Sequence, residues 1–219
     1  MNDTPLLNVI GELVALGPDS RELTPVIERW LNDFAVMAPL GAPLHPVPRE
    51  AATALYEQAN AAQDQVWFVV YERVTMRPIG ISGLRDIDHA HGRAEFVIWL
   101  GEKDCWGKGY GTETTRLLLN YGFSALSLHT IMLRVYSFNE RGIRAYRRAG
   151  FREIGRWREA HRLAGSAHDI IFMDCLAADF LNDESESQLM NNPIFQRRVD
   201  AARKSLRAGQ GIRIEGIEE

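Results

Sequence analysis

The fold of this chain is decided by one stretch, Trp106-Gly107-Lys108-Gly109-Tyr110-Gly111-Thr112. Three glycines alternate here with larger residues, directly before a segment of helical periodicity. Glycine adopts positive φ without strain and lets the backbone approach a ligand closely. The first amides of a helix have no intrahelical acceptor, so such a turn favours a bound phosphate. A tight turn before a helix, without a ligand, is the alternative that the glycines alone leave open.

The type of phosphate site is narrowed by what surrounds the glycines. No Gly-Lys-Ser/Thr closes the turn, so it is not a Walker loop. The spacing is Gly-x-Gly-x-Gly, and the strands before it are predicted to form a meander, whereas a dinucleotide fold requires a parallel βαβ unit. The pattern therefore favours a nucleotide-bearing cofactor with a single pyrophosphate.

The segments around the turn predict an α/β fold. Residues 66–71, 79–84 and 94–100 favour strands with short connections, which indicates an antiparallel meander. Residues 112–126 predict a central helix buried against a sheet. Beyond it the pattern predicts a strand at 131–135, a helix at 139–149 and strands at 151–154 and 169–175. The order indicates a mixed, largely antiparallel sheet flanked by helices.

The N-terminal third predicts a short strand at 13–16 and an amphipathic helix at 18–32. Four prolines between residues 36 and 48 each remove a backbone donor, which predicts a loop. Residues 49–63 are rich in alanine and predict a second helix.

Composition excludes several classes of protein. A formal net charge of −4 gives no general basic footprint for nucleic acid. No apolar run approaches the roughly 20 residues that cross a bilayer. The N-terminus lacks the pattern of a secretory leader, so we expect a cytoplasmic protein with no membrane partner. Cys105 and Cys175 lie far apart, which favours reduced structural thiols over a zinc site or a disulfide.

Five ordered segments carry a resemblance to the GNAT superfamily of N-acetyltransferases, in the branch of ribosomal-protein N-terminal and spermidine acetyltransferases. The resemblance spans roughly residues 13–180. Its carriers are Ala94-Glu95-Phe96, the glycine turn through Glu113, Leu128-His129-Thr130-Ile131, Asn139 through Tyr146 to Gly150-Phe151, and His168-Asp169 with Met173-Asp174.

The resemblance implies acetyl-CoA as co-substrate and assigns its contacts. The family's pyrophosphate signature falls on Trp106, Gly107, Lys108, Gly109, Tyr110, Gly111 and Thr112. Trp106 stands where the family has Gln or Arg, which puts one side-chain contact in doubt. Val97, Ile98 and Trp99 would pair through their backbone with the pantetheine arm. Asn139 matches the family's asparagine, and Gly142 replaces a small hydroxyl residue that often follows it.

The chemistry of acetyl transfer requires two proton steps. An alkyl ammonium of pKa about 10.4 is only about one part in two thousand neutral at pH 7, so the acceptor must lose a proton before it attacks. Glu95 is the candidate base, directly or through water, and a surface carboxylate is its alternative. Tyr146 is the candidate acid that protonates the leaving thiolate, and a core tyrosine is its alternative.

Other polar residues carry weaker hypotheses. His129 is expected to pack or to start a strand. His89 and His91 are expected to be solvated in a turn, and no metal is predicted. The arginines of the helix at 139–149 either hold the 3′-phosphate of the cofactor or form a solvated basic face, namely Arg141, Arg144, Arg147 and Arg148.

Two domains are predicted. Residues 1–182 form the GNAT-like domain. Residues 183–219 form an acidic linker and a helix with a strand-like end, a C-terminal helical extension that we expect to support a homodimer or larger homo-oligomer, or to dock a partner. The acceptor is a polyamine or other small amine, or a peptide N-terminus. A catalytically weak sensor of acyl-CoA is the alternative function.

Overall fold

A single eight-stranded sheet organises the computed structural model, which describes residues 5–41 and 44–181. The spatial order is β1-β2-β3-β4-β5-β6-β8-β7. Neighbouring strands are antiparallel, except that β5 and β6 run parallel. The strands are β1 (Val9–Ile10), β2 (Val14–Gly17), β3 (Val66–Glu72), β4 (Pro78–Asp88), β5 (Arg93–Leu100), β6 (Thr130–Tyr136), β7 (Arg152–Leu163) and β8 (Ser166–Leu176).

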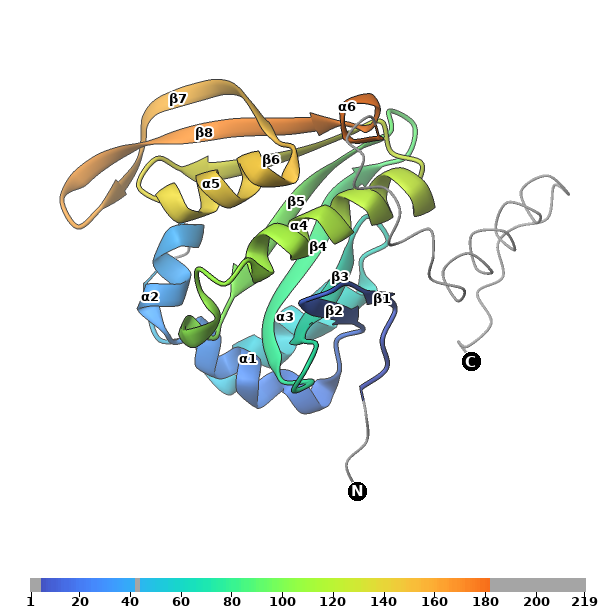
Figure 1. Ribbon diagram of the computed structural model, residues 1–219. Helices are drawn as coiled ribbons and strands as arrows, with labels where there is room; N and C mark the ends of the chain where they lie inside the picture. The colour runs from blue at the N-terminus through green and yellow to red at the C-terminus, as the bar shows by residue number, and fades with distance from the viewer. Residues whose placement is uncertain (1–4, 42–43, 182–219) are drawn as a thin grey trace, which may run out of the picture.

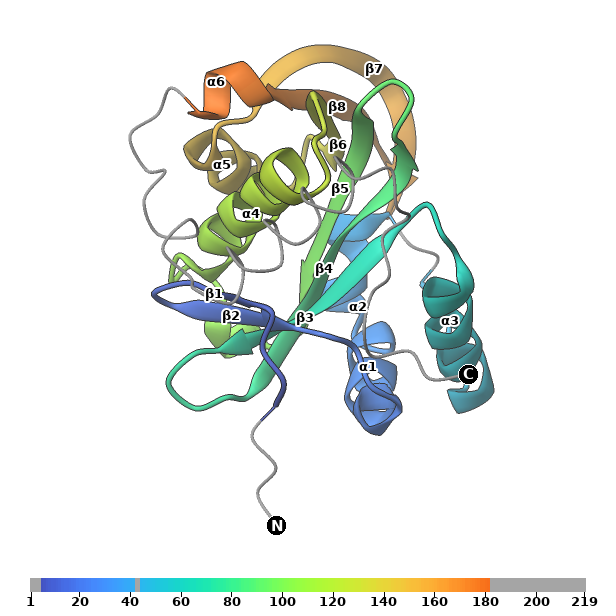
Figure 2. The same ribbon diagram turned by 90° about the vertical axis from the view of Figure 1, so that its right-hand side faces the viewer.

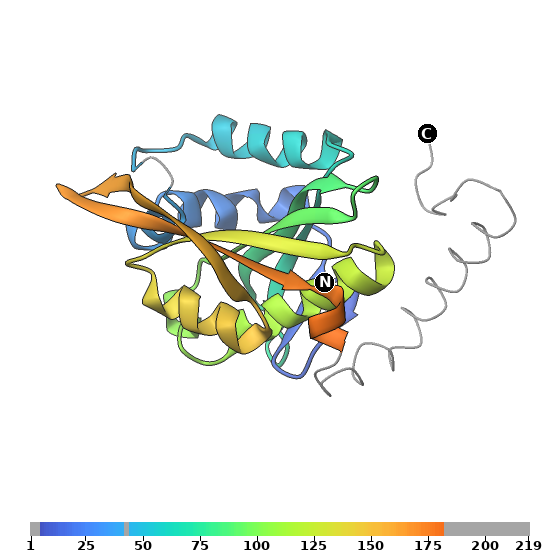
Figure 3. The same cartoon turned by 90° about the horizontal axis from the view of Figure 1, so that it is seen from above.

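Helices cover both faces of this sheet, as Figure 3 shows. One face carries α1 (Thr24–Leu31) and α3 (Arg49–Ala61), and the other carries α4 (Tyr110–Asn120) and α5 (Glu140–Ala149). The remaining helical segments are short. They are η1 (Arg21–Leu23), α2 (Phe34–Met37), η2 (Ala38–Leu40), η3 (Lys103–Cys105), the π-helical turn η4 (Tyr121–Ala125) and α6 (Ala177–Leu181).

Each face of the sheet buries its own apolar cluster. Leu118 and Leu119 of α4 pack with Phe96 and Ile131 on one side. Trp30 of α1 packs with Val69 and Ile81 on the other side. Successive side chains of a strand point to opposite faces, so a central strand such as β5 contributes to both clusters.

The sheet opens into a fork between β5 and β6. These strands pair at only three positions, Arg93 with Thr130, Ala94 with Ile131 and Glu95 with Met132. Beyond Glu95, β5 is bonded to β4 alone and β6 to β8 alone. Figure 1 shows β6 turning away from β5 towards the β7–β8 hairpin. The fork leaves one edge of the C-terminal half of β5 free.

The predicted fold class is confirmed: the sheet is mixed and largely antiparallel, and helices flank it. The meander, the central helix and the later strands occur in the predicted order. The predicted C-terminal helical extension and the proposed boundary near residue 183 lie outside the described residues. None of the helices within residues 5–41 and 44–181 has the length and apolar character needed to span a bilayer.

Several boundaries differ from the prediction, and the strand expected at 79–84 runs from Pro78 to Asp88. The loop expected at 36–48 begins with helical turns, because Asp33 caps α2 and Pro39 lies in the first turn of η2, where no amide donor is needed. The helix expected at 18–32 is divided into η1 and α1. The central helix ends at Asn120 and continues as one π-helical turn. The strand expected at 151–154 extends to Leu163.

Candidate active site

The glycine turn leaves a run of backbone amides without acceptors. Within the described residues, no hydrogen bond has the amide of any residue from Gly107 to Thr112 as its donor. The first amide of α4 with a backbone acceptor is that of Glu113, which donates to the carbonyl of Gly109 at 3.0 Å. Unpaired amides at the positive end of a helix dipole are the groups that bind phosphate oxygens.

Two of the glycines are required by the backbone conformation. Gly107 has φ +78° and Gly109 has φ +91°, both in the left-handed region that other residues rarely adopt. A Cβ added to Gly107 would meet nothing within 4 Å, so conformation and not space selects glycine there. Gly107, Lys108 and Gly109 are exposed in this turn.

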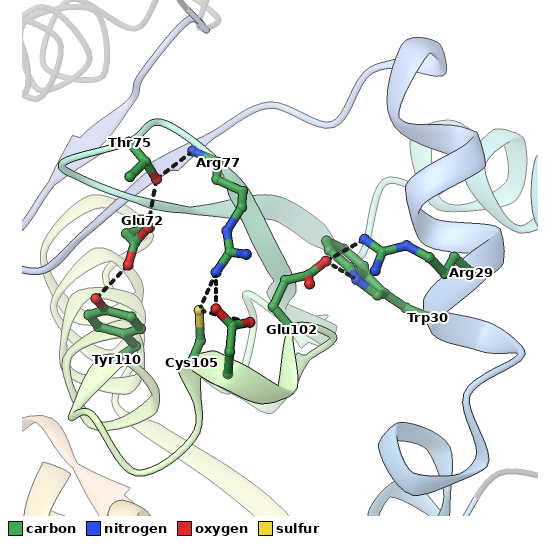
Figure 4. A network of polar contacts seen from close by, with 9 residues as sticks. Arg29, Trp30, Glu72, Thr75, Arg77, Glu102, Cys105 and Tyr110 are labelled. Carbon is green, nitrogen blue, oxygen red and sulfur yellow. Dashed lines mark hydrogen bonds and ion pairs between the residues drawn. The ribbon is translucent and has the colours of Figure 1, made fainter.

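Side chains from the β3–β4 turn hold the glycine turn in place (Figure 4). Arg77 donates to Asp104 at 2.6 Å and to the thiol of Cys105 at 3.1 Å. The hydroxyl of Tyr110 donates to Glu72 at 2.7 Å. These contacts fix both ends of the turn, so its amides are oriented before any ligand binds.

Glu102 links the residues that precede α4 to helix α1, which lies on the opposite face of the sheet. Its carboxylate accepts a hydrogen bond from the indole of Trp30 at 2.9 Å and pairs with Arg29 (Figure 4). Both partners belong to α1. The turn that precedes α4 is therefore connected to the helices on the other side of the sheet.

Glu113, in the first turn of α4, holds the β1–β2 hairpin. Its carboxylate accepts from the amides of Glu12, Leu13 and Val14 at 2.7, 2.8 and 2.7 Å. Figure 2 shows that hairpin next to α4. A negative charge at this helix end also matches the helix dipole.

A cavity of about 330 Å³ lies in front of the glycine turn. Its walls come from the C-terminal half of β5, the turn, α4 and α5, with a contribution from α2 and η2. Of the predicted cofactor residues, Ile98, Trp99, Trp106, Gly107, Gly109, Gly111, Thr112 and Asn139 line it, and Val97, Lys108 and Tyr110 do not. The free edge of β5 and the unpaired amides thus belong to one cavity.

Tyr146 lies in the wall of this cavity. Its ring packs edge-to-face against Phe96 and Phe151, with centroids 6.1 and 6.2 Å away. No hydrogen bond joins its hydroxyl to another described residue. Burial raises the pKa of Tyr146 to about 12, and the charge of Arg141 opposes that effect. The phenol is therefore neutral and a potential proton donor throughout the physiological range.

Glu95 lies at the fork, buried and paired with two arginines. Its carboxylate accepts from Arg134 at 2.9 and 3.0 Å and contacts Arg85 at 3.1 Å. Burial raises the pKa of Glu95, but the bonds from Arg134 and Arg85 outweigh it and the pKa lies below its usual value. Glu95 is consequently ionised and only weakly basic.

Glu95 and Tyr146 belong to opposite faces of the sheet. Phe96 and Tyr146 share the cluster beneath α4 and α5. Glu95 alternates with Phe96 along β5 and shares its face with Trp99, which packs against the cluster beneath α1 and α3. Glu95 lines neither the cavity nor the free edge, because it lies opposite Met132 in the paired part of β5, whereas Tyr146 lies in the cavity wall.

Asn139 caps α5. Its side-chain oxygen accepts a hydrogen bond from the amide of Gly142 at 3.0 Å. A Cβ added to Gly142 would crowd the side chain of Asn139, so a residue without a side chain is suitable there. The helix is thereby fixed at the point where it enters the cavity wall.

The sequence reasoning missed the contact that Trp106 makes. Its indole donates to the carbonyl of Leu100 at 2.9 Å, and the guanidinium of Arg141 lies 3.8 Å from the ring centroid. Arg141, Arg144 and Arg148 line the cavity, whereas Arg147 does not and is paired with Glu153. The spacing from Trp106 to Arg141 gives no local signal, because the pair forms only through packing of α5 against the turn.

The cysteines and histidines do not form an evident metal centre in the described part of the chain. Cys105 and Cys175 are buried free thiols. His91 contacts Asp88 at 2.8 Å. No three acidic, histidine or cysteine side chains gather at one point in residues 5–41 and 44–181. The expectation of a protein without a metal stays a prediction.

Comparison with known proteins assigns the family. Residues 13–152 match the family described as Acetyltransferase (GNAT) domain. This chain belongs to the GNAT acetyltransferases. The match covers the meander, the glycine turn, the central helix and α5, so the site described above lies within it.

Relatives agree with the branch that the sequence resembled. Spermidine N(1)-acetyltransferase of Escherichia coli K12 is 31% identical over 143 residues, 65% of this chain and 75% of that protein. YdaF of Bacillus subtilis, named as a ribosomal N-acetyltransferase, is 29% identical over 101 residues, 46% of this chain and 55% of that protein. The chain thus spans little more than half of the latter.

A solved structure extends the similarity to three dimensions. Spermidine N-acetyltransferase from Vibrio cholerae, in complex with CoA and spermine, superimposes with a TM-score of 0.72 at 26% identity. The similarity covers 78% of this chain and all of that one. The two chains therefore share their fold over that part of this chain.

Proposed function

We propose that this chain transfers an acetyl group from acetyl-CoA to a primary amine, by direct attack in a ternary complex. The observation that carries the proposal is the meeting, in one cavity, of the unpaired amides of the glycine turn and the free edge of β5. The amides suit the pyrophosphate, and the strand edge suits the amide groups of the pantetheine arm. A diphosphate joined to an amide-bearing arm with a thioester is the chemistry of acetyl-CoA.

The two faces of β5 suggest which side each reactant uses. The neutral amine attacks the thioester carbonyl from the face of Glu95 and forms the C–N bond. The tetrahedral intermediate then expels the thiolate, and the C–S bond breaks. Tyr146, on the other face, donates its proton to that sulfur and is reprotonated by solvent. Counted from the neutral amine, the nitrogen loses one proton to solvent and Tyr146 regains one, so the products are one amide and one thiol with no net release of a proton. The one proton released overall is the one that the ammonium loses before it attacks.

Proton affinities determine how these side chains can act. A thiol has a pKa of about 8.5 in water, so a phenol of pKa about 12 protonates its thiolate only if the apolar wall also raises the thiol's pKa. Glu95, with its lowered pKa, removes a proton from an ammonium through water and not as a strong base. Asn139, at the start of α5, supports the wall that holds the cofactor.

The acceptor is proposed to be a polyamine or another small amine, and a peptide N-terminus is the second candidate. The spermidine acetyltransferases among the relatives support the first, and the relative named for ribosomal acetylation supports the second. A cytoplasmic location and a homo-oligomer stay predictions from the sequence.

Thiol release from acetyl-CoA, measured with a panel of alkylamines, polyamines and short peptides, tests the proposal. We expect turnover with at least one class and a mass increase of one acetyl group on the product. Tight binding of CoA with no turnover on any amine would instead favour the acyl-CoA sensor. Failure to bind CoA at all would contradict both.

A further inference from the structure

A second cavity, of about 300 Å³, lies on the face of the sheet covered by α1 and α3. Ile27 and Leu31 of α1 and the strand residues Trp67, Ile81 and Trp99 give it a mostly apolar wall, to which Asp19 adds a carboxylate. Trp99 also lines the cavity in front of the glycine turn. The two cavities therefore share a wall at β5, where the proposed reaction takes place.

Asp19 is an acid without a counter-charge. Other carboxylates of this layer have basic partners: Glu28 pairs with Arg49 and Glu57 with Arg21, both at 2.8 Å. Within residues 5–41 and 44–181 no Lys, Arg or His forms an ion pair with Asp19, and no such residue lines the cavity. Among the described residues, its carboxylate accepts a hydrogen bond from the amide of Ser20 at 2.8 Å.

The raised pKa of Asp19 agrees with a carboxylate that lacks a positively charged partner. Burial raises the pKa of Asp19 to about 6, although the amide of Ser20 opposes that effect. Asp19 is half-buried and mostly ionised at neutral pH, and a cation beside it would restore the solvation that partial burial removed.

The aromatic wall suits a cation as well. The rings of Trp67 and Trp99 lie with centroids 6.1 Å apart and planes tilted by 55°. The faces of indole rings attract ammonium groups. The ring nitrogen of Trp99 is buried and has no hydrogen-bond partner among the described residues, so it can donate to a water molecule beside the ligand.

The register of the sheet sets the distance between this charge and the reaction centre. Gly17 pairs with Val69, Val69 with Ile81 and Ile81 with Trp99, in one row across four strands. Adjacent strands lie about 4.8 Å apart, so the row spans roughly 14 Å. Asp19 follows Gly17 by two residues, and Trp99 is on the free edge of β5. A ligand held at Asp19 would therefore need a chain of roughly 10 to 15 Å to reach the free edge of β5.

We propose that this second cavity is the acceptor site and that it selects amines with a second positive charge, held at Asp19 while the free amine meets the thioester at β5. The inference rests on the proposed acetyl transfer and narrows its substrate to linear diamines and polyamines. Trp67 and Trp99 contact the alkyl chain that joins the two nitrogens of the diamine.

Steady-state kinetics with matched amines tests the proposal in the 219-residue chain. Linear α,ω-diaminoalkanes of increasing length are compared with 1-aminoalkanes of equal length. We expect a length optimum for the diamines and at least about a tenfold advantage in kcat/KM over the matched monoamine. Asp19→Asn should raise KM for the diamine by about tenfold or more, leave kcat nearly unchanged and leave the monoamine unaffected.

Glu57→Gln is the matched control, because it also removes one negative charge near α3, but from an exposed pair with Arg21 outside the cavity. It should leave both amines unaffected. CoA affinity equal to wild type would show that Asp19→Asn is folded.

Equal losses for diamine and monoamine, or an unchanged diamine KM, would overturn the role of Asp19. A strong preference for peptides over every diamine would overturn the substrate class. If no amine is acetylated, the proposed reaction fails. Calorimetric titration of a diamine into the CoA-bound protein and its Asp19→Asn variant then tests the cavity separately, and Asp19-independent binding would contradict it.

Discussion

Tyr146 is a side chain whose packing and proposed chemistry can be separated. Tyr146→Phe keeps the ring against Phe96 and Phe151 and removes only the hydroxyl. Because general acid catalysis contributes about 10²- to 10⁴-fold, we expect kcat to fall by about 10²-fold or more while CoA affinity stays near wild type. Stopped assays of thiol release and calorimetry of CoA measure the two quantities. Unchanged kcat would remove Tyr146 from the acid role.

Asp19 predicts a pH-dependent difference in stability. Its folded-state pKa is raised to about 6, so the folded protein holds that proton more tightly than the unfolded chain, whose Asp has a pKa near 4. This contribution to stability is present below about pH 4 and is lost as the pH rises through about 6.

The corresponding variant should show the effect in thermal unfolding. Asp19→Asn keeps an oxygen for the amide of Ser20 and removes the charge, so its Tm should exceed that of wild type at pH 7.5 and match it at pH 4. A lower Tm at pH 7.5 would mean that Asp19 has a stabilising partner in the folded protein.

At the scale of elements, the glycine turn is predicted to depend on backbone conformation. Gly107→Ala forces a Cβ into the left-handed region, at a cost of about 1 to 2 kcal/mol in stability or a rearranged turn. CoA affinity should fall in parallel, because the amides are displaced. Gly155→Ala is the matched control, since its added Cβ also meets nothing within 4 Å and its φ is not positive. Equal CoA affinity in both variants would contradict the proposal that the amides of the glycine turn bind the pyrophosphate.

The elements that the sequence predicted best are those with strong local patterns. The meander and the central helix follow from unbroken β-favouring runs and a helical apolar period that few competing structures satisfy. The turn at Trp106 to Gly111 was also interpretable from the sequence, because its alternating glycines indicate positive φ. Gly107 and Gly109 do adopt positive φ.

Other features were out of reach because they arise from tertiary contacts. The helical turns of α2 and η2 lie in a proline-rich segment, and only Asp33 at the cap signals them. The arginine partners of Glu95 come from β4 and β6, ten and 39 residues away in the chain, so its lowered basicity has no local signature. The second cavity likewise combines residues of five elements and loops, and periodicity does not reveal it.

For the whole molecule, the two apolar clusters predict how much of the chain the fold requires. Their described members lie within residues 5–41 and 44–181. A chain ending at Asp183 keeps all of these members, so we expect its Tm to stay within a few degrees of wild type and the chain to bind CoA. The sequence also predicts that it loses its assembly, which size-exclusion chromatography with light scattering measures. An unchanged hydrodynamic mass would contradict that role for residues 183–219.

The three-residue pairing of β5 with β6 has a consequence for motion. Because β5 and β6 pair only as far as Glu95 and Met132, their boundary divides the sheet into two parts, with β1 to β5 on one side and β6 to β8 on the other. A coenzyme bound along the open edge of β5 would bridge the boundary between β5 and β6 and slow the local separation of these strands. Amide hydrogen exchange at Thr130 to Met132 should therefore slow with saturating CoA far more than exchange within β3, where both edges already have partners.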